Sequence, residues 1–279
     1  MKPPYVVSLI CSAAFTVMAQ NQELELMNEN LNNTNVVVRR AAAKDLATNS
    51  PEKLGAEIFP VFQKALNDKD QNVRRSAAGA IHRVIAASVA SQNFKLQHGV
   101  KLDLRSDSAL LETATKILLD HIGDEDLEVR RSVISALATG IPITQQIEQA
   151  LFNLYSTERD PRCRSVILAY FSQSKSPRAK ETIMAGLNDV DGEVRGWAAN
   201  AISKFTPLDV AALDRLVVCL KTETNIFAKQ KIVDAIGVYE KAAVKHVPIL
   251  NEIYENETNE LIRASIRSSI LRVDGGHAK

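Results

Sequence analysis

The chain has 279 residues with 46% hydrophobic and 24% charged side chains, a composition that suits one or two globular domains and excludes a disordered chain. Its formal net charge is +1, so no large excess of either sign is available to drive sequence-independent binding to nucleic acid or to an acidic membrane. Only 5% of the residues are aromatic, and a chain whose apolar content is mainly aliphatic favours packed helices over a β-sandwich.

Residues 1–19 are typical of an export signal. Lys2 is the only charged residue in this stretch, and Tyr5 begins an almost unbroken run of apolar and small residues. Small residues precede a candidate cleavage point after Ala19, as signal peptidase requires. We therefore expect a cleaved signal peptide and a periplasmic or secreted protein. Cleavage would remove one lysine and no acid, which leaves a neutral mature chain with no membrane-inserted segment.

An alternative interpretation of the same segment remains open. A single lysine and the pair Pro3-Pro4 are unusual at the start of a signal peptide. Residues 1–19 would then form the outer helix of a terminal repeat, and the protein would be cytoplasmic.

A seven-fold repeat dominates the rest of the sequence. In each unit an Asp or Asn (Asx) is followed four residues later by a basic residue, here called the anchor, and then by an Ala-rich helical pattern. Successive anchors are 35, 56, 34, 31, 34 and 34 residues apart. The pairs of Asx and anchor are Asn35 and Arg39, Asp70 and Arg74, Asp126 and Arg130, Asp160 and Arg164, Asp191 and Arg195, Asn225 and Lys229, and Asn259 and Arg263.

Each unit is predicted to be a pair of helices. Apolar residues recur one before, three after and seven after the anchor, as in Val73, Ala77 and Ile81, and this spacing marks one helical face. The Asx lies where an N-cap would accept the free N–H groups of the first turn. A second apolar helical pattern, such as residues 208–220, lies between successive anchored helices. Because neither helix can bury its stripe alone, we expect an all-α solenoid of about seven pairs over residues 20–273, with a flexible tail at 274–279.

These motifs resemble the HEAT-repeat family, in particular its short bacterial, lyase-like variety. The resemblance covers roughly residues 21–273 and rests on the D-x-x-V-R-x-x-A-x-x-A-L-like pattern of each unit. Pro60 and Pro248 also resemble the proline that kinks the first helix of many HEAT repeats. The resemblance implies an α-solenoid whose second helices line a concave face.

The 56-residue interval between Arg74 and Arg130 predicts an insertion. Within residues 91–106 the apolar residues change from helical to alternating spacing, so that Phe94 would face Leu102 across a turn containing Gly99. We expect a short β-hairpin there; an irregular loop is the alternative.

No catalytic motif, phosphate loop or metal-ligand spacing is present in the sequence. The two cysteines beyond the signal segment, Cys163 and Cys219, each fall within an apolar helical pattern, so buried free thiols are expected. We therefore expect neither enzymatic activity nor a metal or cofactor.

The recurring basic residues have two interpretations. They could bind phosphate, but the recurrence of Asx and cation together favours a ladder in which neighbouring units pair through these residues. Arg40, Arg75 and Arg131 follow the anchors of the first three units only. They form either a basic strip at one end of the concave face or ordinary solvated surface.

Trp197 is the best single candidate for recognition. It lies two residues after an anchor, in a column otherwise occupied mainly by small or polar residues, and exposed Trp is enriched at binding hot spots. Burial between repeats is the alternative. Asn200, Lys204 and Lys231 would be its neighbours in the groove.

These features favour a non-catalytic scaffold that binds a protein partner through its concave face, acts as a monomer and binds no nucleic acid. The resemblance also leaves an enzymatic alternative open, since HEAT-like folds include bilin lyases and alkylpurine DNA glycosylases. The neutral charge and single Trp disfavour a glycosylase, and the export signal disfavours a lyase.

Overall fold

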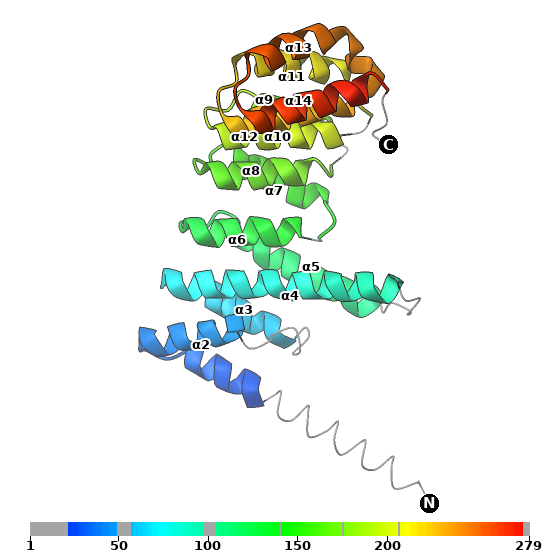
Figure 1. The fold of residues 1–279 in the computed structure, drawn as a ribbon. Helices are drawn as coiled ribbons and strands as arrows, with labels where there is room; N and C mark the ends of the chain where they lie inside the picture. Colours follow the sequence, from blue (N-terminus) through cyan, green and yellow to red (C-terminus); the bar gives the residue numbers. More distant parts are fainter. Residues whose placement is uncertain are drawn as a thin grey trace, which may run out of the picture. The chain divides into compact units, whose positions relative to one another are not determined.

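A computed structural model describes residues 22–48, 57–97, 104–139, 141–174, 176–205 and 207–275 of the chain. These residues contain helices and no strand (Figure 1). They divide into two compact units, Met1–Pro142 and Ile143–Lys279. The predicted signal peptide lies outside the described residues, as does the predicted tail from residue 276 onward. None of the described helices is both long and apolar enough to cross a membrane.

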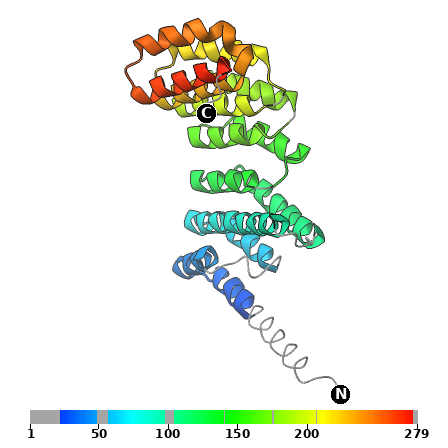
Figure 2. The same ribbon diagram turned by 45° about the vertical axis from the view of Figure 1, so that its right-hand side comes forward.

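The first unit alternates between two layers of helices. A helix over residues 22–31 precedes α2 (Val36–Thr48), α3 (Phe59–Leu66), α4 (Gln71–Gln97), α5 (Leu104–Asp120) and α6 (Leu127–Ala138). The anchored helices α2, α4 and α6 pack side by side and form the inner layer (Figure 2). Helices α3 and α5 form the other layer and contact each other and the inner helices.

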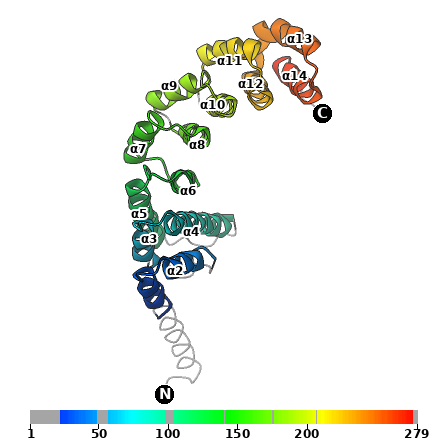
Figure 3. The same ribbon diagram turned by 90° about the vertical axis from the view of Figure 1, so that its left-hand side faces the viewer.

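The second unit repeats this arrangement with four pairs. Its outer helices are α7 (Gln145–Tyr155), α9 (Pro177–Gly186), α11 (Val210–Thr222) and α13 (Val247–Asn256). Its inner helices are α8 (Pro161–Phe171), α10 (Gly192–Lys204), α12 (Ile226–Val238) and α14 (Glu260–Val273), each packed on the next (Figure 3). A 3₁₀ helix, η2 (Glu240–His246), precedes α13. The predicted all-α solenoid of helix pairs is confirmed.

The predicted N-caps are found in all seven inner helices. Asp126, for example, ends an extended segment and accepts hydrogen bonds from the backbone N–H groups of Glu128 and Val129. Satisfying these otherwise free donors is the reason that Asx begins the helix. The other six caps are Asn35, Asp70, Asp160, Asp191, Asn225 and Asn259.

The core of each unit lies between its two layers and follows the predicted stripe. Val73, Ala77 and Ile81 of α4 are fully buried, as are the corresponding Val194 and Ala198 of α10. Alanine in the middle position lets neighbouring inner helices approach closely, while larger aliphatic residues above and below fill the space against the outer layer.

The predicted β-hairpin at residues 91–106 is wrong. Helix α4 continues through Phe94 to Gln97, and α5 begins at Leu104, so Phe94 cannot pair with Leu102 in a strand; residues 98–103 lie outside the described part. No glycine or proline occurs between Gly79 and Gly99, so nothing in the sequence stops the helix earlier. The long interval is therefore largely filled by a 27-residue inner helix.

The two prolines of the first helices begin those helices. Pro60 and Pro248 each lie in the first turn of α3 and α13, where a missing N–H costs no helical hydrogen bond. They do not act as the kinks that the family resemblance implies.

Glu240 carries the only left-handed backbone conformation of a non-glycine residue in the described ranges, with φ of 45° at the turn between α12 and η2. Because a Cβ is disfavoured there, Glu240→Gly should raise the free energy of unfolding by about 0.5–1 kcal/mol. Urea denaturation would measure this, with Lys241→Gly as the matched control, which should lower it. A Glu240→Gly variant less stable than the parent chain would contradict the prediction.

Candidate binding site on the inner helices

A ladder of ion pairs joins neighbouring helix pairs within each unit. In five steps the anchor bonds an acid that lies two residues before the next Asx. Nε of Arg39 is 2.7 Å from Oδ2 of Asp68, and Nε of Arg74 is 2.8 Å from Oδ2 of Asp124. The other three steps are Arg164 to Asp189, Arg195 to Glu223 and Lys229 to Glu257.

The predicted ladder therefore has a different acceptor from the one expected. The Asx already accepts hydrogen bonds from the first turn of its own helix. The acid two residues before it lies in the turn that faces the anchor of the preceding helix pair. That acid also holds the turn together, since the backbone N–H of Asp70 donates to Oδ1 of Asp68 at 2.8 Å. The same contact recurs in later helix pairs; for example, the backbone N–H of Asn225 donates to Oε1 of Glu223 at 2.8 Å.

The anchor Arg74 has all of its guanidinium donors engaged by such contacts. Nη1 of Arg74 donates to the carbonyls of Asp68 and Lys69 at 3.0 and 3.3 Å, while its other nitrogens bond Asp124 and Glu125. The hydrogen bond from Asp124 raises the pKa of the Arg74 guanidinium, against an opposing effect of desolvation. A cation with all its donors engaged and only 6% of its surface exposed has a structural role, not a phosphate-binding one.

The remaining two anchors also contact carbonyl groups. Nη1 of Arg130 donates to the carbonyl of Asp124 at 2.9 Å. Arg263 in α14 donates to the carbonyl of Tyr254 at 2.8 Å, and its guanidinium lies 4.1 Å from the centre of that tyrosine ring.

The three doubled arginines are paired with acids. Arg40 bonds Asp70 at 2.6 Å, Arg75 bonds Asp126 at 2.6 Å, and Arg131 bonds Glu128 at 2.9 Å; the first two acids are N-caps. The hydrogen bond from Arg40 is the largest cause that lowers the pKa of Asp70 to about 2. These arginines lie on the first unit, and their charge is largely offset, which weakens the interpretation as a basic binding strip.

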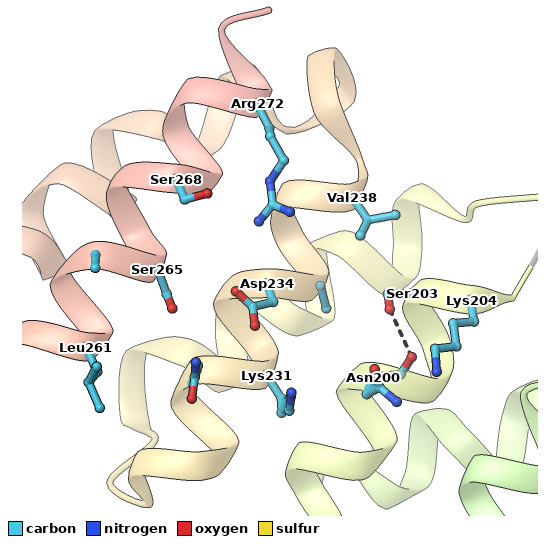
Figure 4. Close-up of a pocket in the computed structure, with 13 residues that line it drawn as sticks. Asn200, Ser203, Lys204, Lys231, Asp234, Val238, Leu261, Ser265, Ser268 and Arg272 are labelled. Atoms are coloured by element: carbon cyan, nitrogen blue, oxygen red, sulfur yellow. Dashed lines mark hydrogen bonds between the residues drawn. The ribbon is translucent and has the colours of Figure 1, made fainter. Parts of the chain in front are cut away.

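A cavity of about 650 Å³ opens on the inner helices of the second unit. Its walls come from α10, α12 and α14, and it contains three of the residues predicted as groove neighbours (Figure 4). Those three are Asn200, Lys204 and Lys231. The cavity is open and carries both polar and apolar side chains, as a surface for a polypeptide partner does.

Trp197 lies one helical turn before Asn200, beside the cavity and not within its wall. Its side chain is partly exposed, at 36%, and its ring centre is 6.0 Å from that of Phe227, with the planes tilted by 50°. A Cβ on Gly196 would stand 2.6 Å from the Phe227 ring, so glycine is what admits Phe227 to this position. The two aromatic rings form an accessible shelf at one end of this cavity, which is called the groove below.

Electrostatics in the cavity are dominated by cations. Lys204, Lys231 and Arg272 make no ion pair within the described part of the chain, and Asp234 is the single acid in the wall. In Figure 4 the Arg272 side chain points toward Asp234, and Lys231 lies one turn before that acid on α12. Burial raises the pKa of Asp234, while Lys231 and Arg272 pull it downward.

Sequence reasoning missed Phe227, Asp234 and Arg272. A usable signal was present, because Asn200, Asp234 and Ser268 each follow their anchor by five residues and all three line the cavity. Arg272 follows its anchor by nine residues and lies on the same helical face as Ser268.

Two cysteines and a histidine outside this cavity are at least partly buried in the fold. Cys163 is buried and Cys219 is half-buried, and burial raises the pKa of the Cys219 thiol. The His82 ring contacts the Thr139 hydroxyl at 2.8 Å, and desolvation lowers the pKa of this histidine. In the portion that the structure describes, no group of His, Cys, Asp and Glu is arranged to hold a metal ion.

Comparison with known proteins agrees with these features. Residues 58–87, which contain α3 and the first part of α4, match the family model of the HEAT repeat. The comparison with curated proteins finds no match.

Among solved structures, an engineered protein is 16% identical with a TM-score of 0.48, covering 91% of this chain and 99% of its own. A computationally designed armadillo repeat protein for modular peptide recognition is 18% identical with a TM-score of 0.43, covering 88% and 98%. At such values the fold assignment rests on the helix pairs themselves. One helix pair matches the HEAT-repeat model directly, and the same Asx and anchor register recurs in all seven pairs.

Proposed function

We propose that this protein is a non-catalytic scaffold that binds a protein partner over the inner helices of its second unit. Stacked helix pairs present extended surfaces of this kind without dedicated chemistry. The cavity over α10, α12 and α14 supplies the concave part of that surface, and its mixed polar and apolar lining suits a polypeptide.

The observation that carries this proposal is the position of Trp197. The only Trp of the chain is partly exposed beside the cavity, held by Phe227, which itself depends on Gly196. A large, rigid aromatic side chain at the edge of a groove is the residue type most often found to dominate binding energy. The anchors in contrast are engaged within the fold and contribute to the surface only indirectly.

Site-specific photo-cross-linking tests the location of the interface. Gln230, which lines the cavity, and Glu181, an exposed residue of the outer helix α9, would each be replaced by p-benzoylphenylalanine. In the cells that produce the protein, we expect a covalent adduct from position 230 that disappears when Trp197→Ala is added. An adduct that forms equally well from position 181, or that is indifferent to Trp197→Ala, would contradict the proposal.

Trp197→Ala should separate binding from stability. We expect partner affinity to fall by about 2 kcal/mol or more, the usual effect of removing an aromatic hot spot. The free energy of unfolding should fall by only about 1–2 kcal/mol, less than for a fully buried Trp, because the ring is partly exposed. Val218→Ala, at an exposed position of α11, is the matched control and should change neither quantity. A larger loss of stability with unchanged affinity would assign Trp197 to packing.

A further inference from the structure

We infer that the groove over α10, α12 and α14 takes an extended polypeptide segment that carries acidic side chains. The inference rests on the proposed function and specifies the chemistry of the partner. It follows from the charges of the groove, its hydrogen-bonding groups and the position of the aromatic shelf formed by Trp197 and Phe227.

The charge of the groove calls for an anionic occupant. Lys204, Lys231 and Arg272 bring three cations to one cavity, whereas Asp234 is the only acid that lines it. Elsewhere in the second unit the ladder cations Arg164, Arg195 and Lys229 each face an acid within 3 Å. The three groove cations form no such ion pair within the described residues, so carboxylates of a partner would form ion pairs with them.

The acceptors of the groove favour a polypeptide over a nucleic acid. The carboxylate of Asp234 and the amide oxygens of Asn200 and Gln230 lie among the cations and need hydrogen-bond donors. An extended peptide backbone offers an N–H from nearly every residue, while a sugar–phosphate backbone offers no N–H to these acceptors. Hydroxyl groups of Ser265 and Ser268 can meet peptide carbonyls in the same groove.

The aromatic shelf sets the spacing of the motif. Trp197 and Lys204 are seven residues apart on α10, which corresponds to about 10 Å along the helix axis. An extended chain covers that distance in about three residues, at roughly 3.3 Å per residue. A segment parallel to α10 would therefore place an apolar side chain on the shelf and an acidic side chain about three positions away.

Peptide binding to the full chain tests this inference. The probe is a fluorescein-labelled peptide with one leucine and, after two intervening residues, two glutamates; the controls have glutamines or lysines in place of the glutamates. Fluorescence anisotropy should show the acidic peptide binding at least tenfold more tightly than either control. Its affinity should also fall as salt rises, because charged side chains contribute to it.

Variants of the chain assign the binding to this groove. Lys204→Ala and the double change Lys231→Ala with Arg272→Ala should each weaken the acidic peptide, the double change by tenfold or more. Lys241→Ala removes an exposed cation outside the groove and should leave the affinity unchanged. Thermal melting of each variant shows whether it is folded. Because the Lys204 side chain is exposed, its replacement provides the test that depends least on folding.

Several results would overturn the inference. These are equal affinity for the acidic and neutral peptides, no binding of any peptide, no effect of the groove variants, or tighter binding of a single-stranded oligothymidylate than of the acidic peptide. The proposed function fails separately, through the cross-linking result. A Trp197-dependent adduct from position 230 together with peptides that bind regardless of charge would retain the scaffold and reject the acidic partner.

Discussion

Arg74→Ala should lower the free energy of unfolding by about 3 kcal/mol, because it removes one partner of a buried ion pair. The side chains of Arg74 and Asp124 are only 8% and 7% exposed. Without the guanidinium, the Asp124 carboxylate and the carbonyls of Asp68 and Lys69 lose their donor in a region that water reaches poorly. Urea denaturation followed by circular dichroism would measure the loss.

Two further variants make the result specific to the ladder. Lys69→Ala removes an exposed cation from the same turn and should change the free energy of unfolding by less than about 0.5 kcal/mol. Arg74→Lys keeps the charge but loses the forked hydrogen bonds, so its stability should be intermediate. If Arg74→Ala is as stable as Lys69→Ala, the ladder does not hold the helix pairs together.

Acid should destabilise the protein steeply below about pH 5. Hydrogen bonds from Arg40, Arg75 and Lys229 are the largest causes that lower the pKa values of Asp70, Asp126 and Glu257. For Glu223 burial acts in the opposite direction, but hydrogen bonds from Arg195 and the backbone outweigh it and lower the pKa. A carboxylate whose pKa is lower in the folded state contributes stability that is present above its unfolded pKa, near 4, and is lost as the pH falls through the folded value.

The window of this loss follows from the shifted groups. It begins below about pH 5 and, for Asp70, continues to about pH 2. Asp234 has the opposite sign because burial raises its pKa, and it offsets only part of the loss. Denaturant midpoints measured from pH 7 to pH 2.5 should fall, and Asp70→Asn should be less stable at pH 7 with a shallower decline. Midpoints that stay constant or rise on acidification would contradict a stabilising role for these paired and capping carboxylates.

The sequence was sufficient to predict the helix pairs and their caps. An N-cap Asx acts within its own first turn, so its role is visible in local spacing. Recognition of the ladder's acceptors required knowledge of which turns face each other. The acids two residues before the Asx, such as Asp124 and Glu223, form a regular column, but sequence alone also permits solvated turn residues.

The inserted segment shows where local spacing misleads. A few alternating apolar residues around Phe94 fit a strand as well as the end of a long helix. In the structure α4 continues to Gln97, in keeping with the absence of a glycine or proline between Gly79 and Gly99.

The groove was predicted in part. Trp197 stood out because it breaks a column of smaller residues, and Lys231 occupies the same column. The contribution of Arg272 depends on the packing of α14 beside α12, a contact between helices distant in sequence. Contacts between stacked helices depend on the three-dimensional arrangement, and the periodicity of the sequence indicates them only weakly.

The binding role of the inner face is tested most directly by acrylamide quenching of Trp197, the only indole in the chain. In the free protein we expect quenching between that of free tryptophan and that of a buried ring, since the side chain is 36% exposed. Addition of the acidic peptide should lower the quenching constant and shift the emission to shorter wavelength. Emission that resists acrylamide in the free protein, or a quenching constant unchanged by the bound peptide, would contradict a role for Trp197 in partner binding.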